Sequence, residues 1–107
     1  MAGRSSLFYI PVSNIQEARK ISRVLLREKL IACANILPKM HSSYWWNGKI
    51  ASSNEVLLLV KAPAKNKVRL QKAVAALHSY EVPCIAEFRI NSLPKAYAKW
   101  LSDSTAN

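Results

Sequence analysis

The order of the hydrophobic segments predicts an α+β protein with a ferredoxin-like split βαβ fold. Apolar residues with a period of two indicate four strands, and apolar residues three or four apart indicate the helices between them. The order is strand, helix, strand, strand, helix, strand, followed by an extra C-terminal helix. We therefore expect a single domain over residues 1–107, an antiparallel sheet and two helices on one of its faces.

A β-hairpin at residues 44–61 is the most explicit local prediction. Asn47-Gly48 readily adopts the positive φ angles of a tight reversal, and residues 52–54 allow a second reversal or a bulge. Side chains alternate along a strand, so Tyr44 and Trp46 point away from Trp45. Both faces of the hairpin are therefore apolar. Because two helices cover only one face of a sheet, we expect the other face to self-associate.

The first strand is expected at residues 7–12, with Pro11 near its end because proline cannot donate to the sheet. Ser13 is predicted to cap the following helix, with Gln16 three residues later completing a capping box. This helix should run to about Lys29. Its buried stripe comprises Ile15, Ala18, Ile21, Val24 and Leu25.

The remaining elements follow the same patterns. The apolar run at residues 30–37 indicates a strand that continues beyond Pro38 into the hairpin. A second helix is predicted from about residue 63 to 78, and a strand over residues 82–90. A last helix should begin at Pro94.

The chain is strongly basic, with 16 Lys and Arg against 6 Asp and Glu and a formal net charge of +10. Such a balance permits electrostatic attraction to nucleic acid. Arg19, Arg23 and Arg27 recur on the predicted exposed face of the first helix, and residues 65–72 hold a second basic cluster. The sequence lacks an RNP pattern, so we expect only non-specific nucleic-acid binding.

Cellular location is predicted from the cysteines and the N-terminus. Cys33 and Cys84 lie in apolar runs without a metal-cluster spacing, which indicates two reduced, buried thiols in a cytosolic protein. The apolar run at residues 7–12 is too short for a signal peptide or a membrane span. We expect a cytoplasmic protein with no membrane partner.

The residue inventory disfavours an enzyme. Gly3 and Gly48 are the only glycines, which excludes a phosphate-binding P-loop and a dinucleotide fingerprint. The only aspartate is Asp103 and the only histidines are His41 and His78, so few combinations could form a catalytic triad. We expect no catalytic activity and no required cofactor.

Residues 78–84 hold the one cluster with metal-binding chemistry. His78 and Cys84 offer nitrogen and sulfur ligands that suit copper or zinc. In the alternative, His78 satisfies carbonyl groups at the helix end and Cys84 is a small buried apolar residue. Two ligands are fewer than the usual three or four. The hypothesis is therefore weak, optional binding of copper or another divalent cation at His78 and Cys84.

A combination of motifs resembles the CutA divalent-cation-tolerance family. Tyr-x-Trp-x-Gly-Lys-Ile at residues 44–50 is followed by His-x-Tyr-Glu-Val-Pro at residues 78–83, and Ala-Cys-Ala-Asn-Ile precedes them at residues 32–36. The resemblance extends over residues 8–101. It implies a ferredoxin-like protomer, a homotrimer, a role in tolerance of copper and other divalent cations, and no established catalytic activity.

The same resemblance bears on the metal ligands. Some relatives are linked to copper through a first-strand cysteine and a histidine near the end of the second helix. Here Ile10 occupies the first-strand position, whereas His78 matches, and Ser79 replaces the usual proline. The alternative function is that of a PII-like trimeric regulator that binds a nucleotide or small anion between subunits. The scarcity of glycine disfavours that alternative, since its loops cradle phosphate with backbone N–H groups.

Overall fold

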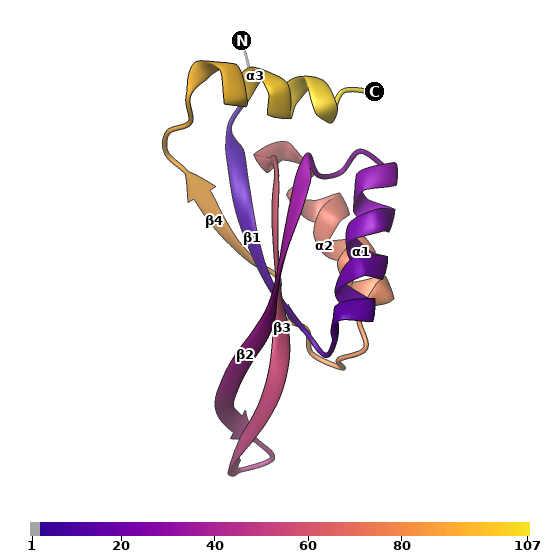
Figure 1. Cartoon of the computed structure of the whole chain (residues 1–107), viewed down its shortest axis with the longest axis vertical. Helices are drawn as coiled ribbons and strands as arrows, with labels where there is room; N and C mark the ends of the chain where they lie inside the picture. Colours follow the sequence, from indigo (N-terminus) through magenta and orange to yellow (C-terminus); the bar gives the residue numbers. More distant parts are fainter. Residues whose placement is uncertain (1–2) are drawn as a thin grey trace.

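A computed structural model describes residues 3–107 and shows a four-stranded antiparallel sheet in the order β2-β3-β1-β4. Helices α1 and α2 lie on the same side of this sheet (Figure 1). This confirms the predicted ferredoxin-like fold. The strands are β1 (Ser5–Val12), β2 (Cys33–Trp46), β3 (Lys49–Pro63) and β4 (Ala86–Ile90).

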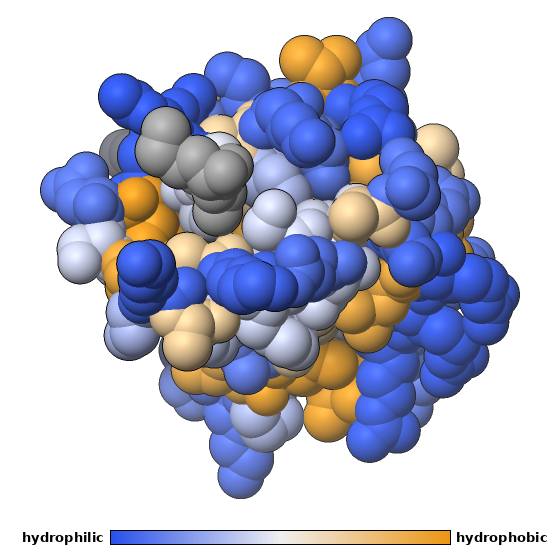
Figure 2. Space-filling model, turned by 90° about the horizontal axis from the view of Figure 1, so that it is seen from above, coloured by the Kyte–Doolittle hydropathy of each residue, from blue (hydrophilic) through white to orange (hydrophobic). Residues whose placement is uncertain are grey.

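The helices agree with the predicted order. Helix α1 spans Ile15–Arg27 and helix α2 spans Lys67–Leu77, which a short 3-10 turn, η1 (Ala64–Asn66), precedes. The extra helix α3 (Lys95–Ser104) lies across one end of the sheet, close to the start of β1 (Figure 1). Figure 2 views this end and shows mostly hydrophilic residues with smaller hydrophobic areas between them.

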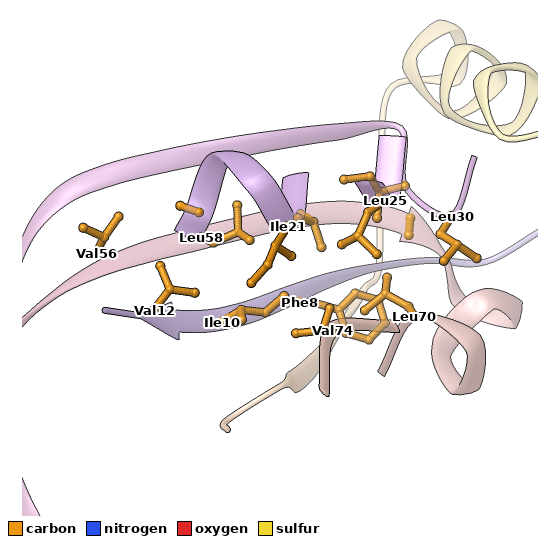
Figure 3. Close-up of a cluster of buried hydrophobic side chains, with 14 residues drawn as sticks. Phe8, Ile10, Val12, Ile21, Leu25, Leu30, Val56, Leu58, Leu70 and Val74 are labelled. Atoms are coloured by element: carbon orange, nitrogen blue, oxygen red, sulfur yellow. The ribbon is translucent and has the colours of Figure 1, made fainter. Parts of the chain in front are cut away.

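The hydrophobic core lies between the sheet and helices α1 and α2 (Figure 3). Every second residue of β1, and of β3 over residues 56–62, is directed at the helices, and full burial of each large side chain contributes about 1.5–3 kcal/mol. Only one face of the sheet is covered in this way. The core includes Phe8, Ile10, Val12, Ile21, Leu25, Val56, Leu58, Val60, Leu70 and Val74.

The opposite face of the sheet, here called the open face, is also apolar. Leu57 and Leu59 of β3 point to this face, where they pair with Leu37 of β2 and Tyr9 of β1, respectively. Leu37 remains 45% exposed, and Phe88 of β4 remains 55% exposed. The structure thus leaves large apolar side chains in contact with water, as the two-faced pattern of the hairpin predicts.

Strands β2 and β3 extend beyond the other strands as a hairpin arm (Figure 1). Asn47 and Gly48 form its turn with φ angles of 50° and 76°, which confirms the predicted reversal. Near the tip, Trp45 is paired with Ile50, and these side chains are 72% and 69% exposed. The arm contributes to the elongated shape, whose extents are 48 × 25 × 23 Å.

The predicted irregularity at residues 52–54 is wrong. Ser52 and Ser53 continue β3 in regular register with β2. The register instead shifts between Leu37 and Met40. Pro38 lies within this shift, and its missing N–H group cannot take part in the sheet.

The N-cap of α1 is one residue later than predicted. The side chain of Asn14, not that of Ser13, accepts the backbone N–H of Glu17 at 2.8 Å. The Glu17 carboxylate in turn accepts the backbone N–H of Ser13 at 2.9 Å. The arrangement resembles a capping box, except that the carboxylate accepts the N–H of the residue before the N-cap instead of the N–H of the N-cap residue.

The last strand is shorter than predicted, because only Ala86–Ile90 pairs with β1. Val82 is 73% exposed, and Pro83 lacks the N–H group that a strand would use. The predicted alternation holds within β4. Phe88 shares the open face with Leu7 of β1, whereas Glu87 lies on the helix side near Lys67.

Candidate functional site

The segment between α2 and β4 is held against the rest of the fold by His78. Its Nε2 lies 2.8 Å from the carbonyl oxygen of Pro11, and its Nδ1 accepts the backbone N–H of Tyr80 at 3.1 Å. This arrangement places the proton on Nε2, because Nδ1 must be the acceptor. Both ring nitrogens are thus engaged in structural hydrogen bonds.

A carboxylate of α1 holds the same segment. Oε2 of Glu17 accepts the backbone N–H of Ser79 at 2.6 Å. Burial opposes ionisation of this carboxyl group, but hydrogen bonds from Ser13 and Ser79 outweigh it and lower the pKa of Glu17. An ionised Glu17 therefore links the beginning of α1 to the residues that follow α2.

Tyr80 connects the segment to β3. Its hydroxyl donates a 2.6 Å hydrogen bond to Oε2 of Glu55, a residue that is only 9% exposed. Burial raises the pKa of Tyr80, and the hydrogen bond to the Glu55 carboxylate raises it further. The phenol is therefore held in its neutral, donating form.

The Tyr80–Glu55 contact borders a pocket of about 630 Å³ between the hairpin arm and residues 80–84. Such a volume is in the range of small-molecule sites. Tyr44 and Trp46 both line it, which confirms that they share one face of the hairpin. The other charged, aromatic or thiol-bearing lining residues are Glu55, Tyr80, Glu81 and Cys84.

The two predicted metal ligands lie in different surroundings. Cys84 is exposed and lines the pocket, whereas His78 is absent from the lining and bonded at both nitrogens. Within residues 3–107, no group of three or more His, Cys, Asp and Glu side chains is arranged to hold a metal ion. The prediction of two buried thiols is wrong in this chain, because Cys33 is also partly exposed, beside the Tyr97 hydroxyl.

Sequence reasoning missed the role of Glu55. It follows a polar stretch and precedes the buried Val56, and its partner Tyr80 is 25 residues away along the chain. One local signal was available, since a carboxylate at the start of a buried strand needs a hydrogen-bond donor. The identity of that donor depends on how the 78–85 segment packs.

The sheet order, the two helices on one face and the open apolar face define a ferredoxin-like α+β protein. Its chain belongs to a known family: the profile described as "CutA1 divalent ion tolerance protein" matches residues 6–104. The divalent-cation tolerance protein CutA of Thermus thermophilus is 38% identical over 96 residues, which cover 90% of this chain and 93% of that protein. The comparisons give no support to a PII-like regulator.

Solved structures agree with this assignment. The crystal structure of CutA1 from Oryza sativa has a TM-score of 0.95 and 33% identity, and the match covers 98% of this chain and 96% of that one. A structure from Archaeoglobus fulgidus, named as a periplasmic divalent cation tolerance protein, has a TM-score of 0.93 and 32% identity, with 95% and 99% covered. Among the helices of residues 3–107, none is long and apolar enough to cross a membrane.

Proposed function

We propose that this protein is a cytoplasmic, non-enzymatic homotrimer that contributes to tolerance of copper and other divalent cations. The observation that carries the proposal is the open face of the sheet. Helices α1 and α2 lie on the other side of the sheet and leave Leu37 and Phe88 exposed on this face, and an exposed apolar surface of this kind is typical of an interaction site. Burial against further copies of the chain removes these side chains from water.

Closed cyclic symmetry is the expected form of such an assembly, because it satisfies every copy of the interface. The number three follows from the family resemblance. The hairpin arm adds further exposed apolar surface, since Trp45 and Ile50 are exposed near its tip, on the strand face opposite to that of Leu57. Family membership supports the role in divalent-cation tolerance.

A pair of matched charge substitutions tests the assembly. Leu37 on the open face is 45% exposed and Leu26 on α1 is 43% exposed. We expect neither Leu37→Glu nor Leu26→Glu to destabilise the fold of a single protomer, because water already reaches both side chains. We expect Leu37→Glu to dissociate the assembly in analytical ultracentrifugation and Leu26→Glu to leave it intact. An unchanged mass for Leu37→Glu would count against the open face as the interface.

We further propose weak copper binding at His78, with the Cys84 thiol as the second ligand. The His78 ring is bonded at both nitrogens, so copper must displace either the Pro11 carbonyl or the Tyr80 N–H. Exposed Cys84 needs no such exchange. Imidazole and thiolate are suitable ligands for copper, and the two ligands together predict modest affinity.

Calorimetric titration with copper tests this site. We expect His78→Ala and Cys84→Ser each to weaken binding, while His41→Ala on strand β2 leaves it unchanged. His78→Ala also removes structural hydrogen bonds, so circular dichroism must show that the variant is folded. An isotherm that neither His78→Ala nor Cys84→Ser alters would place copper elsewhere.

A further inference from the structure

The charge around the 630 Å³ pocket is opposite to that of the whole chain. The protein has 16 Lys and Arg but only 6 Asp and Glu, yet the pocket is bordered by Glu55 and Glu81 and by no lysine or arginine. Another cavity of the same molecule has the opposite charge. A second cavity of about 410 Å³ beside α3 is bordered by Arg4, Lys65 and Arg89. The larger pocket is therefore a local acidic site on a basic protein.

Glu55 provides an anchoring group for a cation. The residue is 9% exposed, and its Oε2 accepts the Tyr80 hydroxyl. No donor among residues 3–107 reaches Oε1 within hydrogen-bond distance. An ionised carboxylate has about four acceptor positions, so Glu55 retains the capacity to accept further hydrogen bonds. A charged donor forms the stronger kind of hydrogen bond with such a group.

Aromatic side chains form the walls of the same pocket. Tyr44 and Trp46 come from β2, and Tyr80 comes from the segment after α2. The faces of aromatic rings attract ammonium and guanidinium groups, and tryptophan does so most strongly. The rings also provide apolar surface for the aliphatic stem of such a ligand.

The pocket suits an organic cation better than a bare metal ion. Its volume is far larger than one ion requires, and residues 3–107 contain no group of three His, Cys, Asp or Glu side chains arranged as metal ligands. Aromatic walls add nothing to the coordination of a divalent ion, which prefers oxygen, nitrogen or sulfur ligands. The same walls are the recognition element for alkylammonium compounds.

We propose that this pocket binds a small free organic cation that carries a primary ammonium or guanidinium group. The cationic head lies against the Glu55 carboxylate and its stem lies between Tyr44 and Trp46. Glu81 adds negative charge at the rim. This site goes beyond the proposed function and does not depend on copper binding at His78.

Backbone amide NMR on the complete chain tests the proposal with n-butylammonium and n-butylguanidinium chloride as probes. We expect saturable shifts at residues 44–46, 55 and 80–84. The neutral probe 1-butanol matches n-butylammonium in size and should bind about tenfold more weakly, because it cannot form the charged hydrogen bond. Equal affinity for the neutral probe would overturn the proposal.

Substitutions of the two pocket glutamates provide a second test of the proposal. Glu55→Gln keeps the shape and an acceptor for Tyr80, and we expect it to weaken n-butylammonium binding about tenfold. Glu81→Gln should weaken binding less and does not disturb the Tyr80 contact. The matched control Glu28→Gln changes the same charge at the exposed end of α1 and should have no effect.

Two results contradict the proposal directly. One is binding that neither Glu55→Gln nor Glu81→Gln changes. The other is an absence of shifts in the pocket of the wild-type assembly, which would mean that a second copy of the chain already fills it. Cys84 also lines the pocket, so the carboxylate substitutions, which leave His78 and Cys84 unchanged, distinguish this site from the copper site.

Discussion

The hydroxyl of Tyr80 donates a 2.6 Å hydrogen bond to the carboxylate of Glu55. This contact joins the segment after α2 to the point at which β3 leaves the core and becomes the hairpin arm. It fixes one wall of the pocket, since both residues line it. This hydrogen bond therefore ties the start of the arm to the segment after α2.

Removal of this pair should destabilise the fold. We expect Tyr80→Phe to lower the free energy of unfolding by about 1.5–3 kcal/mol, the usual contribution of a hydrogen bond to a charged group. Denaturant unfolding at a fixed protein concentration measures the change, because self-association also affects apparent stability. A double-mutant cycle with Glu55→Gln should show a coupling energy. Additive effects of the two substitutions would contradict the pairing.

The cap of α1 gives a second prediction. Asn14→Ala should cost about 0.5–2 kcal/mol, since it leaves the Glu17 N–H without its side-chain acceptor. Ser13→Ala should cost less, because the Ser13 backbone N–H still reaches Glu17. Thermal unfolding of the two variants measures both values. A larger loss for Ser13→Ala would restore the N-cap that the sequence pattern favoured.

The lowered pKa of Glu87 makes the stability of the fold depend on pH. The Ser6 hydroxyl donates to its carboxylate at 2.7 Å, and this bond lowers the pKa of Glu87 despite the opposing effect of burial. Arg89 and Lys67 lower it further. A lowered pKa in the folded state gives stability that is complete above the unfolded value and is lost as the pH falls through the folded value.

Thermal unfolding at a series of pH values tests this loss of stability at low pH. The melting temperature should fall as the pH drops below about 4.5, the reference pKa of a glutamate, and Glu87→Gln should remove part of this fall. Ser6→Ala should also reduce it, because the largest cause of the lowered pKa is lost. Identical pH profiles for wild type and both variants would show that Glu87 is not linked to folding. The Glu87 carboxylate also lies 3.7 Å from Nζ of Lys67, and its negative charge offsets part of the positive charge at the start of α2.

The basic stripe of α1 is exposed as predicted, and it gives a prediction about nucleic acid. Binding to single-stranded nucleic acid should be weak, independent of sequence and lost by about 0.5 M salt, where screening is nearly complete. Substitution of Arg19, Arg23 and Arg27 by glutamine should reduce the slope of log affinity against log salt. Filter binding over a salt series measures this slope. A sequence-selective complex that persists in high salt would contradict it.

Local patterns predicted most of the fold. The Asn47-Gly48 turn and the buried alternation of Phe8 and Ile10 depend on backbone preference and on the period of a strand, which the sequence displays directly. The position at which a strand ends depends less on the local sequence. Val82 continues the apolar alternation, yet the chain there does not pair with β1, because Pro83 interrupts the donors.

The candidate site was less accessible to sequence reasoning. The motifs indicated that His78 and Tyr80 matter, but the partners of these residues depend on packing between distant segments. Pro11 is 67 residues from His78, and Glu55 is 25 residues from Tyr80. Cys84 was expected inside because it sits in an apolar run, whereas the loop that carries it turns its side chain to the surface.

Static light scattering of the wild-type protein at micromolar concentration tests the central claim most directly. We propose that further copies of the chain bury the open apolar face and the exposed hairpin arm, and the family resemblance sets their number at three. A homotrimer should give a mass of about 36 kDa, three times the 12.0 kDa of one chain. A mass near 12.0 kDa would show that a single chain tolerates the exposed face, and it would contradict the account.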